Sequence, residues 1–171
     1  MMAAYAAAKR GQTVRLYEKN EKLGKKIFIT GKGRCNLTNG CEVEDLFANV
    51  VTNEKFLYSA FYGLTNRDVM ELFEGWGCRL KVERGNRVFP VSDKSSDVIA
   101  AIAGAIRRAG VEIHLNEEVS SLELRGGRCV GVRMKGQKRP VEVDAVIVAT
   151  GGLSYPATGS TGDGYRFAAE A

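Results

Sequence analysis

The sequence predicts an α/β fold in which a parallel sheet is joined to an antiparallel three-stranded β-meander. The order helix, glycine, strand occurs twice, over residues 2–18 and 96–115. Three alternating apolar segments between residues 118 and 143 are separated by short turns, which is the spacing of β-hairpins. Finally, the continuous apolar run at residues 145–149 is typical of a strand buried in a parallel sheet.

The composition is that of a globular protein, with 171 residues of which 44% are hydrophobic. No apolar run approaches the roughly 18 residues needed to cross a bilayer. Residues 1–8 lack the leading positive charges of a signal peptide. We therefore expect a cytoplasmic protein without a membrane partner.

Metal and disulfide chemistry are disfavoured by the cysteine and histidine content. The four cysteines are far apart and form no C-x-x-C pair, so reduced thiols are expected. The only histidine, His114, lies inside an apolar alternation and reads as a strand residue. We expect no metal site and no histidine-based triad.

The first 40 residues contain a helix, a strand and a loop. Residues 2–10 are rich in alanine and end at Gly11, and residues 13–17 alternate as a strand that ends in Glu18. This is half of a βαβ unit. Residues 21–40 show no periodicity and are predicted to be a loop.

The middle of the chain is predicted to hold helices and two short strands. Residues 45–62 look partly helical, and Thr65 with Asp68 resembles a capping box that opens a helix ending at Gly77. Strands are expected over residues 79–83 and 87–89. The candidate buried residues of the first helical segment are Phe47, Val50, Val51, Leu57 and Phe61.

The second half begins with the repeated helix, glycine, strand unit. Ser96 is predicted to cap a helix over residues 97–109, followed by Gly110 and a strand over residues 111–115. The meander and the apolar run follow, and a last helix begins at Gly164. The helix over residues 97–109 has an apolar face formed by Val98, Ile99, Ile102, Ala105 and Ile106.

Positive charge is concentrated at the start of the chain. Residues 1–40 contain nine Lys or Arg against two Glu, a balance of +7, whereas the other residues contain 16 against 18, a balance of −2. Such a segment attracts phosphate, either of a nucleotide cofactor or of RNA. The alternative is a solvated surface loop.

Glu18 occupies the position at which dinucleotide-binding folds place the acid that binds an adenosine ribose. A surface glutamate at a strand end is the alternative.

The loop at residues 24–39 combines three glycines with cations and polar side chains, which suits close approach to a phosphate group. Its spacing excludes a P-loop. A flexible basic loop remains the alternative.

Cys35 lies next to Arg34 in this loop. A nearby cation lowers the pKa of a thiol, so Cys35 is the candidate proton donor, with structural packing as the alternative.

Farther along, the turns at residues 149–152 and 159–164 are rich in glycine, and the second leads into a helix. Together they favour a ligand crevice, although each alone could be a tight turn.

These blocks resemble a family of FAD-dependent oxidoreductases, the NAD(P)/FAD-dependent, aminoacetone-oxidase-like and bile-acid flavoproteins. The matching segments follow in the expected order along nearly the whole chain: Glu18-Lys19-Asn20, Gly24-Lys25-Lys26, residues 30–39, Arg87-Val88-Phe89-Pro90, residues 149–156 and residues 161–165.

The resemblance implies a partial Rossmann-like FAD-binding domain of the glutathione-reductase type. It places backbone at Val119 near adenine, Glu18 on the ribose, and Arg34, Cys35 and Asn36 near the isoalloxazine or pyrophosphate. The expected cofactor-binding residues are Glu18, Lys19, Lys26, Lys32, Gly33, Arg34, Asn36, Val119, Thr150, Gly151, Gly152 and Asp163. Cys35 is the expected catalytic residue.

The resemblance also implies a fragment of a longer enzyme. The first strand and its glycine-rich turn are expected before Met1, and the remaining FAD domain with an inserted β domain after Ala171. The expected activity is electron transfer between NAD(P)H and a small-molecule or RNA substrate through FAD. The alternatives are synthesis of dihydrouridine in ribosomal RNA by the intact parent, and a non-catalytic nucleotide-binding remnant.

Overall fold

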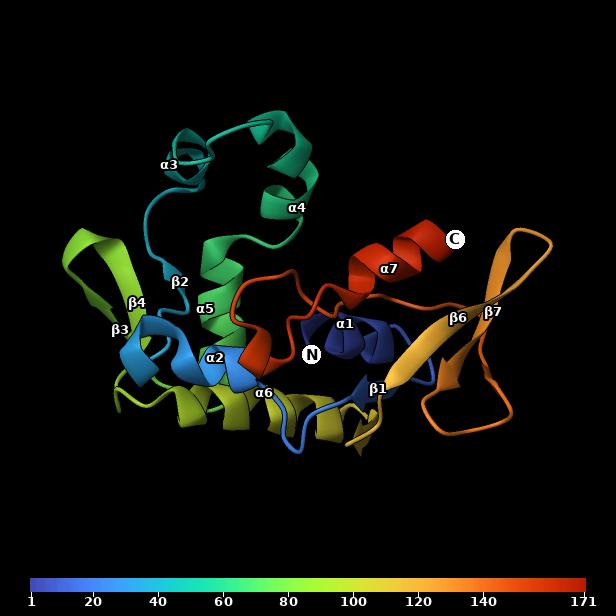
Figure 1. Ribbon diagram of the computed structural model, residues 1–171. Helices are drawn as coiled ribbons and strands as arrows, with labels where there is room; N and C mark the ends of the chain where they lie inside the picture. Colours follow the sequence, from blue (N-terminus) through green and yellow to red (C-terminus); the bar gives the residue numbers. More distant parts are fainter. The chain divides into compact units, whose positions relative to one another are not determined.

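The computed structural model describes residues 1–171 as two compact units (Figure 1). The first unit consists of residues 1–26 and 106–171, and the second of residues 27–105. None of the helices combines the length and apolarity that a membrane span requires.

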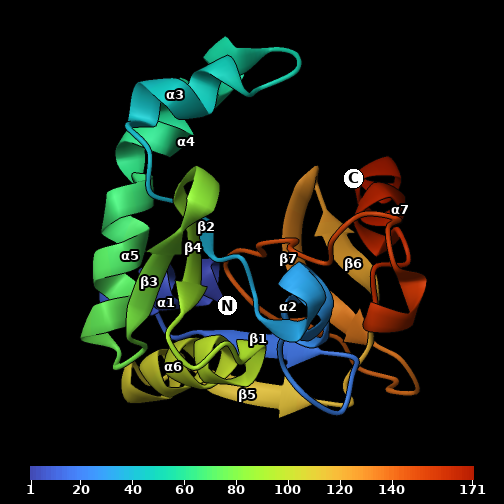
Figure 2. The ribbon, with the colours of Figure 1, turned by 90° about the vertical axis from the view of Figure 1, so that its left-hand side faces the viewer.

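A parallel strand pair forms the centre of the first unit. Helix α1 (Met2–Lys9) leads through Gly11 into β1 (Arg15–Glu18), which pairs with β5 (Glu112–Leu115). Figure 2 shows the two strands side by side and pointing the same way. Gly11 has a φ of +80°, a conformation that terminates a helix at low cost only when the residue is glycine. The predicted helix, glycine, strand pattern is confirmed.

The predicted meander is also confirmed. It consists of β6 (Val119–Arg125), β7 (Arg128–Met134) and β8 (Val141–Glu142), paired antiparallel in that order. Gly131 permits the close pairing of β7 with β8, because a Cβ there would lie 2.5 Å from the Val141 carbonyl oxygen. The last helix, α7 (Asp163–Glu170), packs against β6 and buries Phe167.

The predicted strand at residues 145–149 is wrong. This run forms no strand, and 65% of Ile147 and 43% of Val148 are exposed. An apolar run becomes a buried parallel strand only when neighbouring strands pair with its backbone. No strand of the chain pairs with this run, so it remains extended and irregular.

The second unit contains a small antiparallel sheet in the order β2-β4-β3. Its strands are β2 (Thr38–Asn39), β4 (Arg87–Pro90) and β3 (Leu80–Glu83). Helix α2 (Lys25–Ile29) and a 3-10 turn (Thr30–Gly33) occupy the segment predicted to be a loop. A helix of five residues is too short to produce a detectable apolar period, which explains the difference.

An aromatic cluster joins α3 (Val43–Ala48) and α4 (Tyr58–Gly63), which follows a 3-10 turn (Glu54–Leu57). Phe47 is buried and contacts the rings of Tyr58, Phe61 and Tyr62. The expected burial is wrong for Val51, which is 96% exposed. Val50, Leu57 and Phe61 are only partly covered, because one ring occupies the centre of this small cluster.

The capping box is confirmed at the start of α5 (Asn66–Gly75). The backbone N–H of Asp68 donates to Thr65 Oγ1 at 3.1 Å, and the N–H of Thr65 donates to Asp68 Oδ2 at 2.7 Å. The predicted cap at Ser96 is wrong, because α6 (Ser95–Arg108) begins one residue earlier. Ser95 is buried, and its hydroxyl donates to the Phe28 carbonyl at 3.0 Å.

The predicted apolar face of α6 is confirmed, with Ile99 partly exposed at its margin.

Ile106 is 0% exposed, so truncating its side chain leaves a cavity. We expect Ile106→Ala to lower the free energy of unfolding by ~2–5 kcal/mol, measured by denaturant titration. Val51→Ala is the control, with an expected change within about 0.5 kcal/mol. Equal effects of the two substitutions would contradict the assignment of Ile106 to the core.

Candidate functional site

The carboxylate of Glu18 lies at the carboxyl end of β1 and is held in place by Asn20. Its Oε1 accepts the backbone N–H of Asn20 at 2.9 Å and the side-chain amide of Asn20 at 2.7 Å. The backbone N–H of Glu117 donates to the Glu18 carbonyl at 3.1 Å, which ties this strand end to the segment after β5. Both of these bonds are made by Oε1, which leaves Oε2 without a hydrogen bond, and the carboxylate also interacts electrostatically with the Met1 ammonium.

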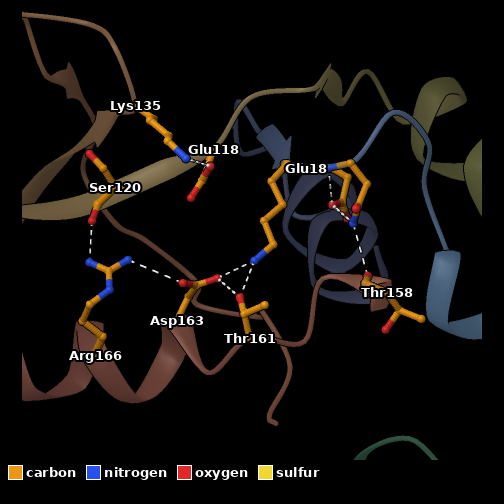
Figure 3. Close-up of polar contacts among 10 residues, drawn as sticks. Glu18, Glu118, Ser120, Lys135, Thr158, Thr161, Asp163 and Arg166 are labelled. Carbon is orange, nitrogen blue, oxygen red and sulfur yellow. Dashed lines mark hydrogen bonds and ion pairs between the residues drawn. The ribbon is translucent and has the colours of Figure 1, made fainter. Parts of the chain in front are cut away.

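The segment before α7 presents Thr158, Thr161 and Asp163 toward the residues that follow Glu18 (Figure 3). Lys19 Nζ donates to Asp163 Oδ2 at 2.7 Å and to the hydroxyl of Thr161, which itself donates to Asp163 at 2.9 Å. Asn20 donates to the Thr158 carbonyl at 3.2 Å. The hydrogen bond from Lys19 lowers the pKa of Asp163. We call residues 18–20 and 158–163 the clasp.

Two glycines of the clasp have a left-handed backbone conformation. Gly159 has a φ of +99°, and a Cβ there would lie 2.7 Å from the amide nitrogen of Asn20. Gly162 has a φ of +81°, and a Cβ there would lie 2.7 Å from the side chain of Leu153. A side chain at either position would strain the backbone, and at Gly159 it would also displace the side-chain amide of Asn20.

The turn at Thr150, Gly151 and Gly152 packs against the clasp. The Gly162 N–H donates to the Gly152 carbonyl at 3.1 Å. A Cβ at Gly164 would lie 3.1 Å from the hydroxyl of Thr150. The two glycine-rich turns are therefore adjacent, and they lie beside the Glu18 end of β1.

Lys26 and Val119 lie in the same unit but have different surroundings. Lys26 Nζ donates to the carbonyl of Ser154 at 2.9 Å and to its hydroxyl at 2.6 Å, and it lies 5.6 Å from the centre of the Tyr155 ring. Its charge thus holds the segment after the glycine turn. Val119 is the first residue of β6 and pairs with Met134.

The remaining predicted residues, Lys32, Gly33, Arg34, Cys35 and Asn36, lie in the second unit. Arg34 donates from Nε to Asp93 at 2.8 Å, forms a second ion pair with Glu83, and lies 4.1 Å from the centre of the Phe89 ring. Lys81 contacts the same carboxylates, at 2.7 Å from Asp93 and 3.3 Å from Glu83. Arg34 is therefore already neutralised by carboxylates of its own unit.

The expected lowering of the Cys35 pKa is wrong. Burial of Cys35, which is 5% exposed, raises the pKa of its thiol, and a hydrogen bond with Thr30 opposes this only in part. Arg34 does not compensate, because its guanidinium is engaged by Glu83 and Asp93. Lys32 is exposed and has no ion pair.

Several contacts could not be found from sequence patterns. Glu83 and Asp93 are far from Arg34 in the chain, and Thr158 and Thr161 are far from residues 18–20. Only the folded chain brings them together. No three His, Cys, Asp or Glu side chains lie close enough to hold a metal ion.

Residues 1–171 match the family model described as the HI0933-like protein Rossmann domain. The chain belongs to this family. This HI0933-like chain is 34% identical over 170 residues to a 3-dehydro-bile acid delta(4,6)-reductase of Clostridium scindens. It is 29% identical over 170 residues to the ribosomal RNA dihydrouridine synthase of Haemophilus influenzae. Each alignment covers 98% of the chain, and the HI0933-like chain spans 40% and 41% of these relatives.

Solved structures show the same fold. An oxidoreductase from Methanosarcina mazei matches the HI0933-like chain with a TM-score of 0.50 at 15% identity, covering 95% of this chain and 58% of the other. THI4 of Thermovibrio ammonificans matches with a TM-score of 0.51 at 13% identity, covering 77% and 42%. The predicted Rossmann-like α/β class and the family resemblance are therefore confirmed.

Burial of Cys35 predicts low thiol reactivity, since the thiolate is the nucleophile. At neutral pH we expect iodoacetamide to modify Cys35 several-fold more slowly than the partly exposed Cys41, as measured by peptide mass spectrometry. In denaturant the two rates should become similar. Faster modification of Cys35 in the folded chain would contradict its raised pKa.

The Arg34 cluster predicts a pH-dependent stability. The hydrogen bond from Arg34 holds the pKa of Glu83 below its ordinary value, and those from Lys81 and Arg34 do the same for Asp93. A lowered carboxylate pKa stabilises the folded state above the ordinary pKa, and this stabilisation is lost as the pH falls through the folded-state value.

We therefore expect Arg34→Met to be less stable than the wild type at neutral pH. The difference should shrink as the pH falls below the folded-state pKa values of these carboxylates, measured by denaturant titration at several pH values. Arg67→Met, which removes an exposed ion pair with Glu42, is the control with little effect. A difference between Arg34→Met and wild type that does not change with pH would contradict this prediction.

Proposed function

We propose that this chain is the FAD-binding domain of an oxidoreductase. The observation that carries the proposal is the placement of Glu18, whose carboxylate lies at the end of a parallel strand and keeps one oxygen available. In dinucleotide-binding folds an acid at this position accepts hydrogen bonds from a ribose. The family membership and the reductase among the relatives support the same function.

The residues of the first unit fit an adenosine and its phosphates. Glu18 would accept the ribose hydroxyls, the backbone at Val119 would approach the adenine, and the turn at Thr150–Gly152 would close over the cofactor. Lys19, Lys26 and Asp163 are engaged with one another or with the neighbouring loops. We therefore assign these three to positioning the turn that borders the cofactor.

In the second unit, taken by itself, the proposed phosphate-binding groups are Lys32, the backbone of Gly33 and the side chain of Asn36. Arg34 positions this loop through Glu83 and Asp93. The raised pKa of Cys35 keeps its thiol protonated at neutral pH, which is the form that a proton donor needs. When bound, FAD would supply the hydride and electron chemistry, with NAD(P)H as the proposed electron donor.

Two substrate classes follow from the relatives: a steroid-like small molecule, as the name of the Clostridium scindens reductase indicates, and RNA, as the name of the Haemophilus influenzae synthase indicates. A dihydrouridine synthase reduces a pyrimidine double bond, for which a thiol proton donor is suited. The generic flavin-dependent oxidoreductase remains the first proposal, and RNA is the second candidate.

The test is the affinity for FAD of purified wild type and Glu18→Gln, measured by titration of flavin fluorescence. Loss of a charge-assisted hydrogen bond costs about 1.5–3 kcal/mol, so we expect affinity to fall roughly tenfold or more. Glu71→Gln, an exposed site on α5, is the control and should bind as the wild type does. Unchanged affinity in Glu18→Gln would overturn the role of Glu18. Absence of FAD binding by a chain extended upstream to include the glycine-rich turn expected before Met1 would overturn the proposed cofactor.

A further inference from the structure

Asn20 connects four parts of the first unit. Its backbone N–H and its side-chain amide both donate to Glu18 Oε1, at 2.9 and 2.7 Å. The same amide donates to the Thr158 carbonyl at 3.2 Å, and its Oδ1 accepts from Lys25 Nζ at 3.4 Å. Its backbone carbonyl accepts the N–H of Asn116 at 3.0 Å. One residue thus links the acid at the end of β1 to the loop before α7 and to the segment after β5.

The partners of the Asn20 amide determine its orientation. An ammonium group only donates hydrogen bonds, whereas a carboxylate and a carbonyl only accept them. The amide oxygen must therefore face Lys25, and the amide nitrogen must face Glu18 and Thr158. Gly159 lies against the same nitrogen, since a Cβ there would be 2.7 Å from it. The amide is held on Glu18 Oε1 by contacts at both of its ends.

This arrangement makes the two oxygens of Glu18 unequal. Each oxygen of an ionised carboxylate has about two positions for an incoming hydrogen bond. Both positions of Oε1 are filled by Asn20, and Oε2 has no hydrogen bond. A ribose has two adjacent hydroxyl groups, which can use both oxygens of a free carboxylate. Here only Oε2 is open, so one hydroxyl receives the strong, charge-assisted hydrogen bond.

We propose that Asn20 is a positioning residue that restricts Glu18 to a one-oxygen contact with the cofactor ribose, so that one ribose hydroxyl dominates recognition. The inference rests on the proposed function and deepens it, because it states how the ribose is selected. The alternative is an asparagine that only closes a turn through its backbone. That role requires neither the second bond from the side-chain amide to Oε1 nor the bond to Thr158.

The test compares ADP, 2′-deoxy-ADP and 3′-deoxy-ADP as competitors of FAD, measured by flavin fluorescence on the chain extended upstream. The extension also removes the Met1 ammonium that interacts with Glu18. One deoxy analogue should bind roughly tenfold or more weakly than ADP, because it lacks the hydroxyl bound by the carboxylate. The other should bind within about threefold of ADP, since its missing hydroxyl makes no charge-assisted bond.

The variant Asn20→Ala removes the side-chain bond to Oε1 and opens a position there for the second hydroxyl. The two deoxy analogues should then lose affinity to a similar degree. A general loosening of the clasp would weaken all three nucleotides alike and would leave the ratio between the analogues unchanged. The ratio therefore separates the proposed role from a merely structural one.

A second variant, Asn20→Asp, keeps the shape of the side chain but cannot donate when ionised. It places a second carboxylate beside Glu18, so FAD should bind more weakly than to the wild type at neutral pH. Repulsion between two carboxylates raises their apparent pKa, and a shared proton restores a hydrogen bond to Oε1 as the pH falls. The difference in affinity from the wild type should shrink accordingly.

The matched control is Asn116→Asp, which adds the same charge at an exposed position. Asn116 contacts Asn20 only through its backbone N–H, which the substitution keeps. We expect this variant to bind FAD as the wild type does at each pH.

Similar losses for the two deoxy analogues in the wild type would overturn the inference, because Glu18 would then contact both hydroxyls. An unchanged ratio in Asn20→Ala would overturn the role of Asn20, as would a weakening by Asn20→Asp that does not vary with pH. Binding of FAD together with any of these results overturns this inference alone. Absence of binding by both FAD and ADP would overturn the proposed function and this inference with it.

Discussion

The ion pair between Lys19 and Asp163 is the interaction on which the candidate site depends. It joins the residue after Glu18 to a loop 144 positions away, and Thr161 and Asn20 extend the same connection. Because Gly159 lacks a side chain, the loop can approach Asn20 this closely. The glycine turn at residues 150–152 is then fixed beside the end of β1, where Glu18 presents one unengaged oxygen.

In the second unit, folding decides which cations of the basic loop form ion pairs and which remain unpaired. Arg34 and Lys32 are nearly adjacent in the chain, yet one is neutralised by two carboxylates and the other is exposed without an ion pair. The same pairing removes the cation that could have activated Cys35, and burial then controls the thiol. A buried, protonated thiol is poorly suited to nucleophilic attack.

The parallel pair β1 and β5 gives the first unit two chemically different edges. Its carboxyl edge holds Glu18 and the clasp, while its amino edge receives two helix ends with unpaired cations.

Local patterns in the sequence determined much of the fold. Periodicity, glycine stops and the Thr65–Asp68 spacing determined the helices and the meander, because each depends on residues close together in the chain. They also located Glu18 and the glycine-rich turns. Only the tertiary structure decided that residues 145–149 form no strand, that Arg34 is neutralised and that the Cys35 pKa is raised. Strand pairing, ion pairing and burial all depend on partners distant in sequence, and no local pattern specifies those partners.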